Sequence, residues 1–317
     1  MKAIVLTLVI GLHGFFAVES QAAEDWKWTG FEVVGSHSVS RDKIIAELPI
    51  KVGDTYKEDQ PQWQKWCDNL KKKFDFYHAG CSSVRFLDFR AFLVVDIVEK
   101  GEEYRLKFRN PPKDDIAIKD PQIFAWYDQL MARLWELFDE GVSAGEHTNG
   151  DYLDFKDDRM HELVGKLVEK SPASKDNLIE IIKADKDSQK RAKAAWLLNW
   201  ALTPVDSIES VYSYLDDPVR LVRNDISRFM SHWTADVKDE QLQKGLVDAF
   251  VLQMKRPSHA DRNKSLSNLE SLITSIPNLG PYLKATGGSE IDHIAANSVL
   301  ENVGGLAKNL QKLIGSK

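Results

Sequence analysis

The chain has 317 residues, of which 43% are hydrophobic and 28% are charged, and its formal net charge at pH 7 is -6. This composition is typical of a folded, soluble protein, and the length predicts two domains because it exceeds one ordinary hydrophobic core. The acidic balance argues against nucleic acid as a partner, since neutralising phosphates requires a concentrated basic face.

The first 22 residues have the pattern of a secretory signal peptide. Lys2 precedes an apolar run over residues 3–18, and small residues follow at Ser20 and Ala22. This pattern predicts cleavage before Ala23. A retained membrane anchor is the alternative, because the run is short for a spanning helix of about 20 residues. No later segment has the length or purity of a transmembrane helix, so we expect no membrane span after removal of the signal.

The predicted export bears on the state of the two cysteines, Cys67 and Cys81. An exported protein meets an oxidising environment, which predicts a disulfide between them. A bridge that closes a loop of about 15 residues stabilises a fold by roughly 3 kcal/mol. Two buried free thiols are the alternative. A zinc site is not expected, because two cysteines do not supply the four ligands that zinc prefers.

Five elements are predicted before residue 100. In chain order they are a strand at 28–34, a helix at 40–48, a helix at about 60–76, and strands at 83–89 and 91–99. The longer helix places Trp63, Cys67 and Leu70 on one apolar face, which must meet a sheet. The last strand is more continuously apolar than the one before it, so we expect the last strand at the centre of the sheet and 83–89 at an edge.

The predicted order of elements is strand, helix, helix, strand, strand, and three short sequence motifs accompany it. These are Phe31-Glu32-Val33-Val34-Gly35, Val52-Gly53-Asp54-Thr55-Tyr56 and Val95-Asp96-Ile97-Val98-Glu99. Together they resemble the POTRA domain. Members of that family lie in the periplasm and bind other polypeptides. The resemblance implies a sheet edge that accepts a strand from a partner, with Val84, Arg85 and Phe86 as contact residues. A packing module without a binding role is the alternative.

The domain boundary is predicted at Asn110-Pro111-Pro112-Lys113-Asp114-Asp115, a stiff polar segment. The predicted organisation is a signal peptide at 1–22, a POTRA-like domain at 23–109, a linker at 110–120 and a helical repeat domain at 121–317.

The segment 139–158 is irregular and contains Gly141-Val142-Ser143-Ala144-Gly145. These letters match the nucleophile elbow of hydrolases, and His147 and His161 are close in sequence. The context does not match, because the elbow requires an apolar strand before the serine and a helix directly after it. We therefore expect a loop here, and an envelope hydrolase that uses Ser143 is an alternative function.

Residues 178–233 contain two blocks of helix-forming sequence that repeat with a spacing of 30, so that Leu178 returns as Ile208 and Asp187 as Asp217. Each block predicts an apolar helix, an acidic turn and a second helix. The pattern, and especially the run from Asp217 to Arg223, resembles the HEAT repeat. The resemblance implies stacked helical hairpins in which Asp187 pairs with Lys193 and Asp217 with Arg223.

A binding groove is expected along the second helices, which form the inner wall in the HEAT family. They carry Lys190, Arg191, Arg220 and Arg228, which are not matched by an equal number of acidic residues on the same helices. Such a groove favours an acidic segment of a protein. A degenerate third block at 242–273 and a closing helical segment from Ile291 complete the array.

The predicted fold class is α+β and multidomain, with a small β-α-α-β-β two-layer domain followed by an all-α HEAT-like solenoid. The predicted function is an exported protein–protein interaction or scaffold protein in the periplasm of a Gram-negative bacterium, serving envelope or outer-membrane protein assembly. The partner is a protein or peptide, and association with an envelope complex is left open. No catalytic residue, cofactor, metal or nucleic acid is predicted. A polysaccharide-binding protein that stacks sugars on Trp26 and Trp28 is a further alternative.

Overall fold

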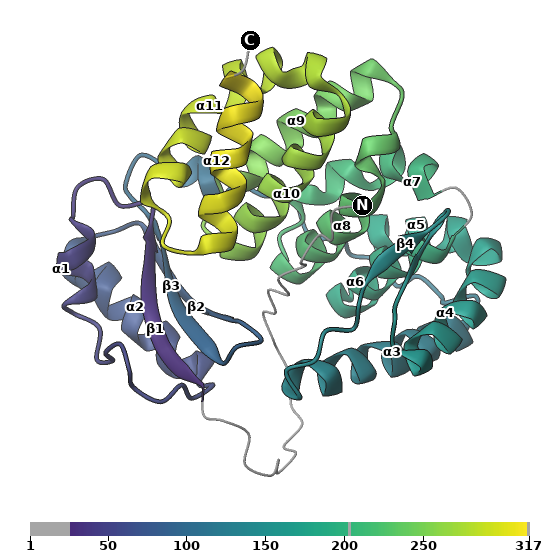
Figure 1. Ribbon diagram of the computed structural model, residues 1–317, viewed down its shortest axis with the longest axis horizontal. Coiled ribbons are helices and arrows are strands. Elements are labelled where there is room, and N and C mark those ends of the chain that lie inside the picture. The colour runs from purple at the N-terminus through teal and green to yellow at the C-terminus, as the bar shows by residue number, and fades with distance from the viewer. Residues whose placement is uncertain (1–25, 202–203, 316–317) are drawn as a thin grey trace.

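The computed structural model describes residues 26–201 and 204–315 (Figure 1). It consists of a small three-stranded sheet with two helices, followed by a long series of helices, which confirms the predicted α+β class. The predicted signal peptide at 1–22 and its cleavage before Ala23 lie outside the described residues. Within the described ranges, no helix combines the length and apolar character needed to cross a bilayer.

The sheet domain has the predicted order of elements. They are β1 Lys27–Val34, α1 Arg41–Ile45, α2 Gln60–Phe74, β2 His78–Arg85 and β3 Arg90–Val98. The strand order is β1-β3-β2, with β1 parallel and β2 antiparallel to β3. The central place of β3 agrees with its buried residues 91–98. However, β2 begins at His78, five residues before the predicted start. The sequence did not indicate this part of the strand because its small residues show no hydrophobic alternation.

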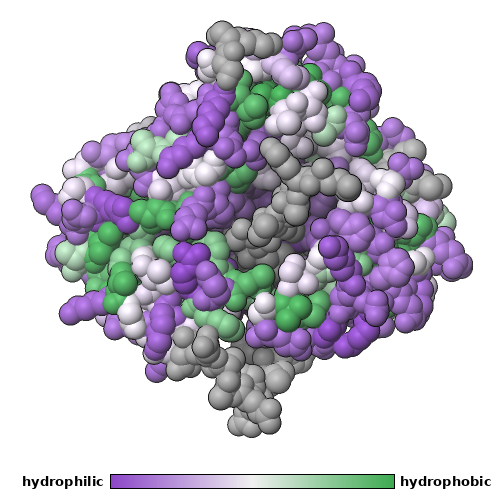
Figure 2. All heavy atoms as spheres, viewed as in Figure 1, coloured by the Kyte–Doolittle hydropathy of each residue, from purple (hydrophilic) through white to green (hydrophobic). Residues whose placement is uncertain are grey.

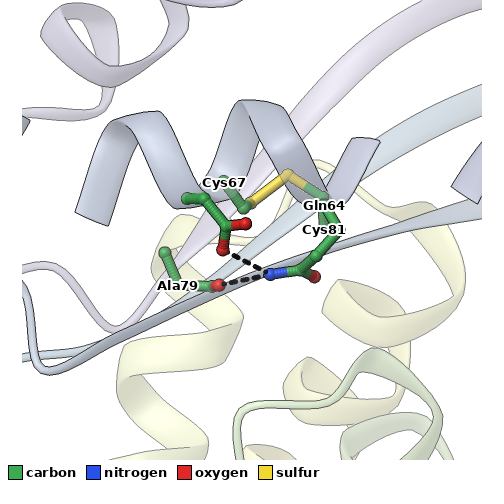
Figure 3. Close-up of a disulfide and its surroundings, with 5 residues drawn as sticks. Gln64, Cys67, Ala79 and Cys81 are labelled. Carbon is green, nitrogen blue, oxygen red and sulfur yellow. Dashed lines mark hydrogen bonds between the residues drawn. A yellow bond between two sulfur atoms is a disulfide. The ribbon is translucent and has the colours of Figure 1, made fainter. Parts of the chain in front are cut away.

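The disulfide between Cys67 and Cys81 is confirmed, with 5.7 Å between the two Cα atoms. It joins the buried face of α2 to β2, as Figure 3 shows. One turn away, the Gln64 side-chain amide donates to the Ala79 carbonyl oxygen at 3.4 Å and to Asp68 at 3.0 Å. The covalent bond and the hydrogen bond to Ala79 fix the helix on the strand.

The rest of the chain is mostly helical. Its elements are α3 Pro121–Asp139, β4 His147–Asn149, β5 Tyr152–Asp154, α4 Asp158–Lys170, α5 Lys175–Ala184, α6 Ser188–Leu197, α7 Pro204–Val211, α8 Arg220–Trp233, α9 Glu240–Met254, α10 His259–Ser275, α11 Gly280–Asn297 and α12 Glu301–Gly315. From α5 onward they form hairpins whose second helices, α6, α8, α10 and α12, pack on one another in sequence order. We call this series the array.

A buried arginine on each of α6, α8 and α10 secures its own turn. Its Nη1 donates to the main-chain carbonyl oxygen six residues earlier, which belongs to Asp185 for Arg191 (2.8 Å) and to Asp217 for Arg223 (2.7 Å). Arg262 makes the same contact with the carbonyl oxygen six residues before it, at 3.4 Å. The three arginines are therefore equivalent positions of three successive units.

Each of these arginines also reaches a carboxylate outside its own turn. Arg191 pairs with Asp217 at 3.0 Å and Arg223 with Asp261 at 2.6 Å, so each ion pair joins one unit to the next. Both arginines are nearly inaccessible to solvent. Paired, hydrogen-bonded charges are the form in which ionised side chains are tolerated in a protein interior.

Asp217 and Arg223 do bond as predicted, through the Asp217 main-chain carbonyl oxygen, but the arginine ladder corrects the predicted pairing of Asp187 with Lys193 and the predicted spacing. Asp187 instead caps α6 through the backbone N–H groups of residues 189 and 190, and Lys193 pairs with Asp128 on α3. The equivalent arginines Arg191 and Arg223 are 32 positions apart rather than 30. The first helix of the second unit is extended by the 3-10 segment Tyr212–Asp216, and this extension places the turn two residues later.

The array and the second face of the sheet share one hydrophobic core. Val84, Phe92 and Val94 of the sheet belong to the same cluster of buried side chains as the array helices. Two buried acidic residues of the sheet also contact the array. Glu32 accepts hydrogen bonds from the Ser298 hydroxyl (2.7 Å) and the Val299 backbone N–H (2.8 Å), before α12.

The other sheet carboxylate ends the arginine ladder. Asp96, on β3, lies 2.6 Å from Nη1 of Arg262, and the two residues are only 4% and 2% exposed. The arginine of the third unit therefore pairs with a strand, where the arginines of the first two units pair with the next unit. Asp96 of the sheet thus supplies the carboxylate that an aspartate of the next unit supplies to the first two arginines.

A second contact joins the sheet domain to the beginning of the helical region. The Arg85 guanidinium lies 4.7 Å from the ring centre of Trp26 and 5.3 Å from that of Phe138, near the end of α3. The two rings are themselves 5.5 Å apart. The sheet domain thus touches both α3, at the lower right in Figure 1, and the α10–α12 end of the array, which lies above the sheet in that view.

The predicted linker also packs on the array. Ile116 donates its backbone N–H to Asp185 at 2.8 Å, and Lys119 donates to the Asn177 side chain at 2.9 Å. Just before the linker, Arg109 forms an ion pair with Asp216. These contacts make the segment part of the folded structure.

Candidate partner-binding site

The outer edge of β2 leaves backbone groups without backbone partners. On its inner side β2 pairs with β3 along its whole length, from His78 opposite Val98 to Arg85 opposite Ala91. On its outer side, no residue within 26–201 or 204–315 forms a backbone–backbone hydrogen bond with it, and the only side-chain bond to its backbone comes from Gln64. A strand edge of this kind can accept an extended peptide.

The opposite edge of the sheet is covered by the chain itself. The Trp28 N–H donates to the Asp54 carbonyl oxygen at 2.9 Å, and the Gly53 N–H donates to that of Trp28 at 2.8 Å. The Tyr56 N–H donates to the carbonyl oxygen of Trp26 at 2.7 Å. The first residues of β1 therefore already have a partner, which distinguishes this edge from that of β2.

The exposed edge also lacks the usual protection against strand pairing. Residues 79–84 are Ala, Gly, Cys, Ser, Ser and Val, without a charge or a proline, and their register with β3 is free of bulges. Charged side chains, prolines and bulges are the means by which proteins commonly block an edge. The disulfide at Cys81 instead holds the strand in a fixed position.

The three predicted contact residues, at the end of β2 and just after it, are buried or half-buried against other elements. Val84 is 1% exposed and lies in the core shared with the array, and Phe86 packs edge-on against Phe92 with 5.7 Å between ring centres. Arg85 lies against Trp26 and Phe138 at the contact with α3. Their side chains join the sheet to the helices, so the accessible part of the edge is the backbone of residues 78–83.

The basic residues predicted to line the groove are largely matched by acids from other segments. Lys190 pairs with Asp185 at 2.5 Å, and Arg191 belongs to the arginine ladder. Arg228 forms a buried ion pair with Glu146, while Arg220 is half-buried at the first residue of α8. These four side chains therefore do not form one exposed basic surface.

Arg228 instead belongs to a buried charged cluster that joins four segments. Glu146, from the irregular segment after α3, pairs with Arg228 and lies 3.1 Å from Nε2 of His232. Asp225 accepts a hydrogen bond from Asn224 at 3.0 Å. The Arg228 guanidinium also lies 4.6 Å from the Trp196 ring centre, and Lys264 of α10 completes the cluster.

Burial shifts the pKa values of this cluster. It raises the pKa of Asp225 to about 7 and, with the charge of Arg228 beside it, lowers the pKa of Lys264 to about 7. Burial alone would also raise the pKa of Glu146, but the charges of Arg228 and His232 lower it to about 2. Both Asp225 and Lys264 therefore change charge near neutral pH, whereas Glu146 stays ionised.

Sequence reasoning missed Glu146, Asp225 and Lys264. Asp225 and Lys264 occupy buried positions of α8 and α10, where helical periodicity could have placed them on the inner face. Nothing in the sequence marks Glu146, because it lies in a loop and meets Arg228 from 82 positions away.

The loop residues of the hydrolase alternative are not brought together. The Ser143 hydroxyl accepts a hydrogen bond from the Gly145 N–H at 3.2 Å, and His147 Nδ1 contacts the carbonyl oxygen of Gly145 at 3.0 Å. His161 Nδ1 lies 3.0 Å from Asp154. Among the described residues, neither histidine forms the hydrogen bond to Ser143 by which a base activates a nucleophile.

Comparisons with protein families, with curated proteins and with solved structures found no match to this chain. Residues 26–201 and 204–315 also contain no group of three or more His, Cys, Asp or Glu side chains suited to a metal ion.

Proposed function

We propose that the protein is an exported scaffold that binds an extended segment of a partner polypeptide by strand addition at the outer edge of β2. The outer side of residues 78–83, which has no backbone partner among the described residues and carries no protecting charge or proline, is the observation that carries this proposal. Main-chain hydrogen bonds to such an edge supply affinity with little dependence on the partner's sequence. This chemistry suits a protein that receives extended segments of other chains.

Evidence for export supports the proposal, and part of it is the disulfide bond next to the proposed binding edge. The disulfide between Cys67 and Cys81 is consistent with an oxidising environment, and the signal pattern at residues 1–22 favours export to the periplasm. The likeness of the sheet domain to POTRA domains and of the array to HEAT repeats points in the same direction, toward envelope or outer-membrane protein assembly. The ordered β-α-α-β-β domain and the stacked hairpins fit both resemblances.

The proposal is tested by photocrosslinking in intact cells. A photoreactive residue at Ser82, on the exposed edge, is expected to capture a polypeptide that mass spectrometry can identify. The same reporter at Lys308, an exposed residue of α12, provides the control. Absence of any polypeptide at Ser82, with the protein folded and abundant, would refute strand addition.

Proline substitutions give a second test. Adjacent strand residues alternate, so one of Ser82 and Ser83 directs its N–H to β3 and the other directs it outward. Proline removes the N–H at its position, so one of Ser82→Pro and Ser83→Pro breaks a hydrogen bond to β3 and should lower stability. The variant that keeps the stability of the parent chain has lost only the outward N–H. We expect that variant to lose crosslinking from a reporter at Gly80. Full crosslinking by a stable proline variant would contradict the proposal.

A further inference from the structure

The loop after α3 carries one buried carboxylate on an otherwise exposed segment. The Glu146 side chain is only 7% exposed and pairs with Arg228 of α8, whereas all three residues of β4, which follow it, are exposed. Among residues 26–201 and 204–315, Glu146 is the only side chain of 139–151 that forms a hydrogen bond or ion pair with α5–α12. The polar attachment of this loop to the array therefore depends on a single acidic side chain.

The place that receives this carboxylate is basic. Burial raises the pKa of Glu146, but the charges of three facing side chains outweigh burial and lower it to about 2. These side chains are Arg228, His232 and Lys264, and we call them the carboxylate site. A buried guanidinium requires an ionised partner, because an unpaired charge in a protein interior is strongly unfavourable. The carboxylate site therefore needs an anion, and in the free chain Glu146 supplies it.

Glu146 leaves part of the carboxylate site unused. It meets Arg228 through Nη2, and the buried Nε of the same guanidinium has no acceptor among the described residues. Nε2 of His232 lies 3.1 Å from Oε1 of Glu146, but the two atoms are not aligned for a hydrogen bond. A guanidinium binds a carboxylate most strongly through two parallel N–H groups. A carboxylate that approaches from another direction can therefore use donors that the loop does not reach.

We propose that Glu146 holds the place of a carboxylate from an acidic segment of a partner polypeptide, and that the loop withdraws when this segment occupies the carboxylate site. Gly145 and Gly150 lie on either side of Glu146 with φ of +66° and +61°. Glycine changes between such conformations and ordinary ones at little steric cost, so the backbone can turn at both positions. The inference rests on the proposed function in taking the ligand to be a polypeptide.

The charges of the cluster favour a carboxylate over a phosphate group. Asp225 is a second acid beside Arg228 and Lys264, so a doubly charged phosphate placed there meets stronger like-charge repulsion than a carboxylate does. The net charge of -6 on the whole chain also opposes unspecific attraction of acidic peptides. Binding of an acidic peptide therefore requires a local basic site.

Calorimetric titration of the full mature chain tests the inference. The probe is a ten-residue peptide of alternating serine and glutamate with blocked ends, and the comparison ligands are the same peptide with glutamine in place of glutamate, and inorganic phosphate. We expect Glu146→Ala to bind the acidic peptide about 10-fold more tightly than the parent, or better. The apparent affinity of the parent is reduced by the fraction of open loops, which we take as about a tenth or less.

Three results of this titration would overturn the inference. They are the absence of saturable binding of the acidic peptide by Glu146→Ala, equal affinity of the parent and Glu146→Ala, and binding of the glutamine peptide or of phosphate as tightly as the acidic peptide. The first result would leave Glu146 as a structural anchor of the loop, and the last would remove the assignment to a carboxylate.

Further variants guard against misfolding and locate the binding. Glu146→Gln keeps the size of the side chain and removes its charge, so it should also bind more tightly than the parent. Glu140→Ala removes an exposed acid at the start of the same loop and should bind like the parent. Adding Arg228→Gln to Glu146→Gln should weaken binding by about 30-fold or more, because it removes one partner of the charge pair. Unchanged affinity without this arginine would refute the carboxylate site.

The outcomes also separate this inference from the strand-addition proposal. The carboxylate site lies on α8 and α10 and contains no β2 residue. A chain that crosslinks a partner from Ser82 but does not bind the acidic peptide would retain strand addition and lose only the carboxylate site. A chain that binds the peptide but captures no polypeptide at Ser82 would lose strand addition alone.

Discussion

Breaking the ion pair between Asp96 and Arg262 should destabilise the whole protein. Both side chains are almost fully buried, and the pair joins the central strand to α10 at 2.6 Å. Arg262→Met leaves the Asp96 carboxylate buried without its charge partner, which costs about 3–5 kcal/mol of unfolding free energy. Asp96→Asn leaves the guanidinium uncompensated and should cost a similar amount.

Urea denaturation of the mature chain, followed by circular dichroism, measures these changes. The double variant Asp96→Asn/Arg262→Met should be more stable than the sum of the two single effects predicts, because neither charge then remains unpaired. Coupling energies between contacting residues are about 0.5–3 kcal/mol. Lys244→Gln is the control, since its ion pair with Glu240 is exposed and little loss is expected. Single variants within about 0.5 kcal/mol of the parent would refute the role of this pair.

Three further sets of substitutions test other parts of the structure. Replacing Cys67 and Cys81 with serine should lower the unfolding free energy by roughly 3 kcal/mol, measured by denaturation with and without a reductant. Asp225→Asn should stabilise the protein at pH 8 and not at pH 3. The raised pKa, about 7 against an ordinary 3.8, lowers the parent's stability as pH rises between these two values, by up to about 4 kcal/mol; a pH-independent effect in urea denaturation would contradict this. Ser143→Ala and His147→Ala should each leave the unfolding free energy within about 0.5 kcal/mol of the parent, and covalent labelling of Ser143 by a serine-directed probe would count against the scaffold function.

The order of elements could be predicted because it depends on local patterns. The apolar face of α2, the continuous apolar run of β3 and the acidic turns of the array all lie within single segments of sequence. The start of β2 could not be found in this way, because residues 79–83 have side chains too small to alternate between polar and apolar. The strand is instead held by its register with β3 and by the bridge to α2.

The basic residues of the second helices show where local reasoning fails. Arg191 has no acid on its own helix, and the helix of Arg228 carries fewer acidic than basic residues, which predicts exposed charge. Their partners, Asp217 and Glu146, lie 26 and 82 positions away, and only the stacking of the array brings them together. A charge count along one helix cannot detect a partner that comes from another element.

The arginine ladder also bears on how the sheet edge is presented. Because the third arginine pairs with Asp96 and Glu32 accepts two hydrogen bonds before α12, the sheet is held at one end of the array by buried polar contacts. Arg85 and Trp26 hold it to α3, which precedes the array. A domain held at both places offers its edge in one orientation. A partner strand then loses its own conformational entropy on binding while the sheet loses little, and this preorganisation favours affinity through backbone hydrogen bonds alone.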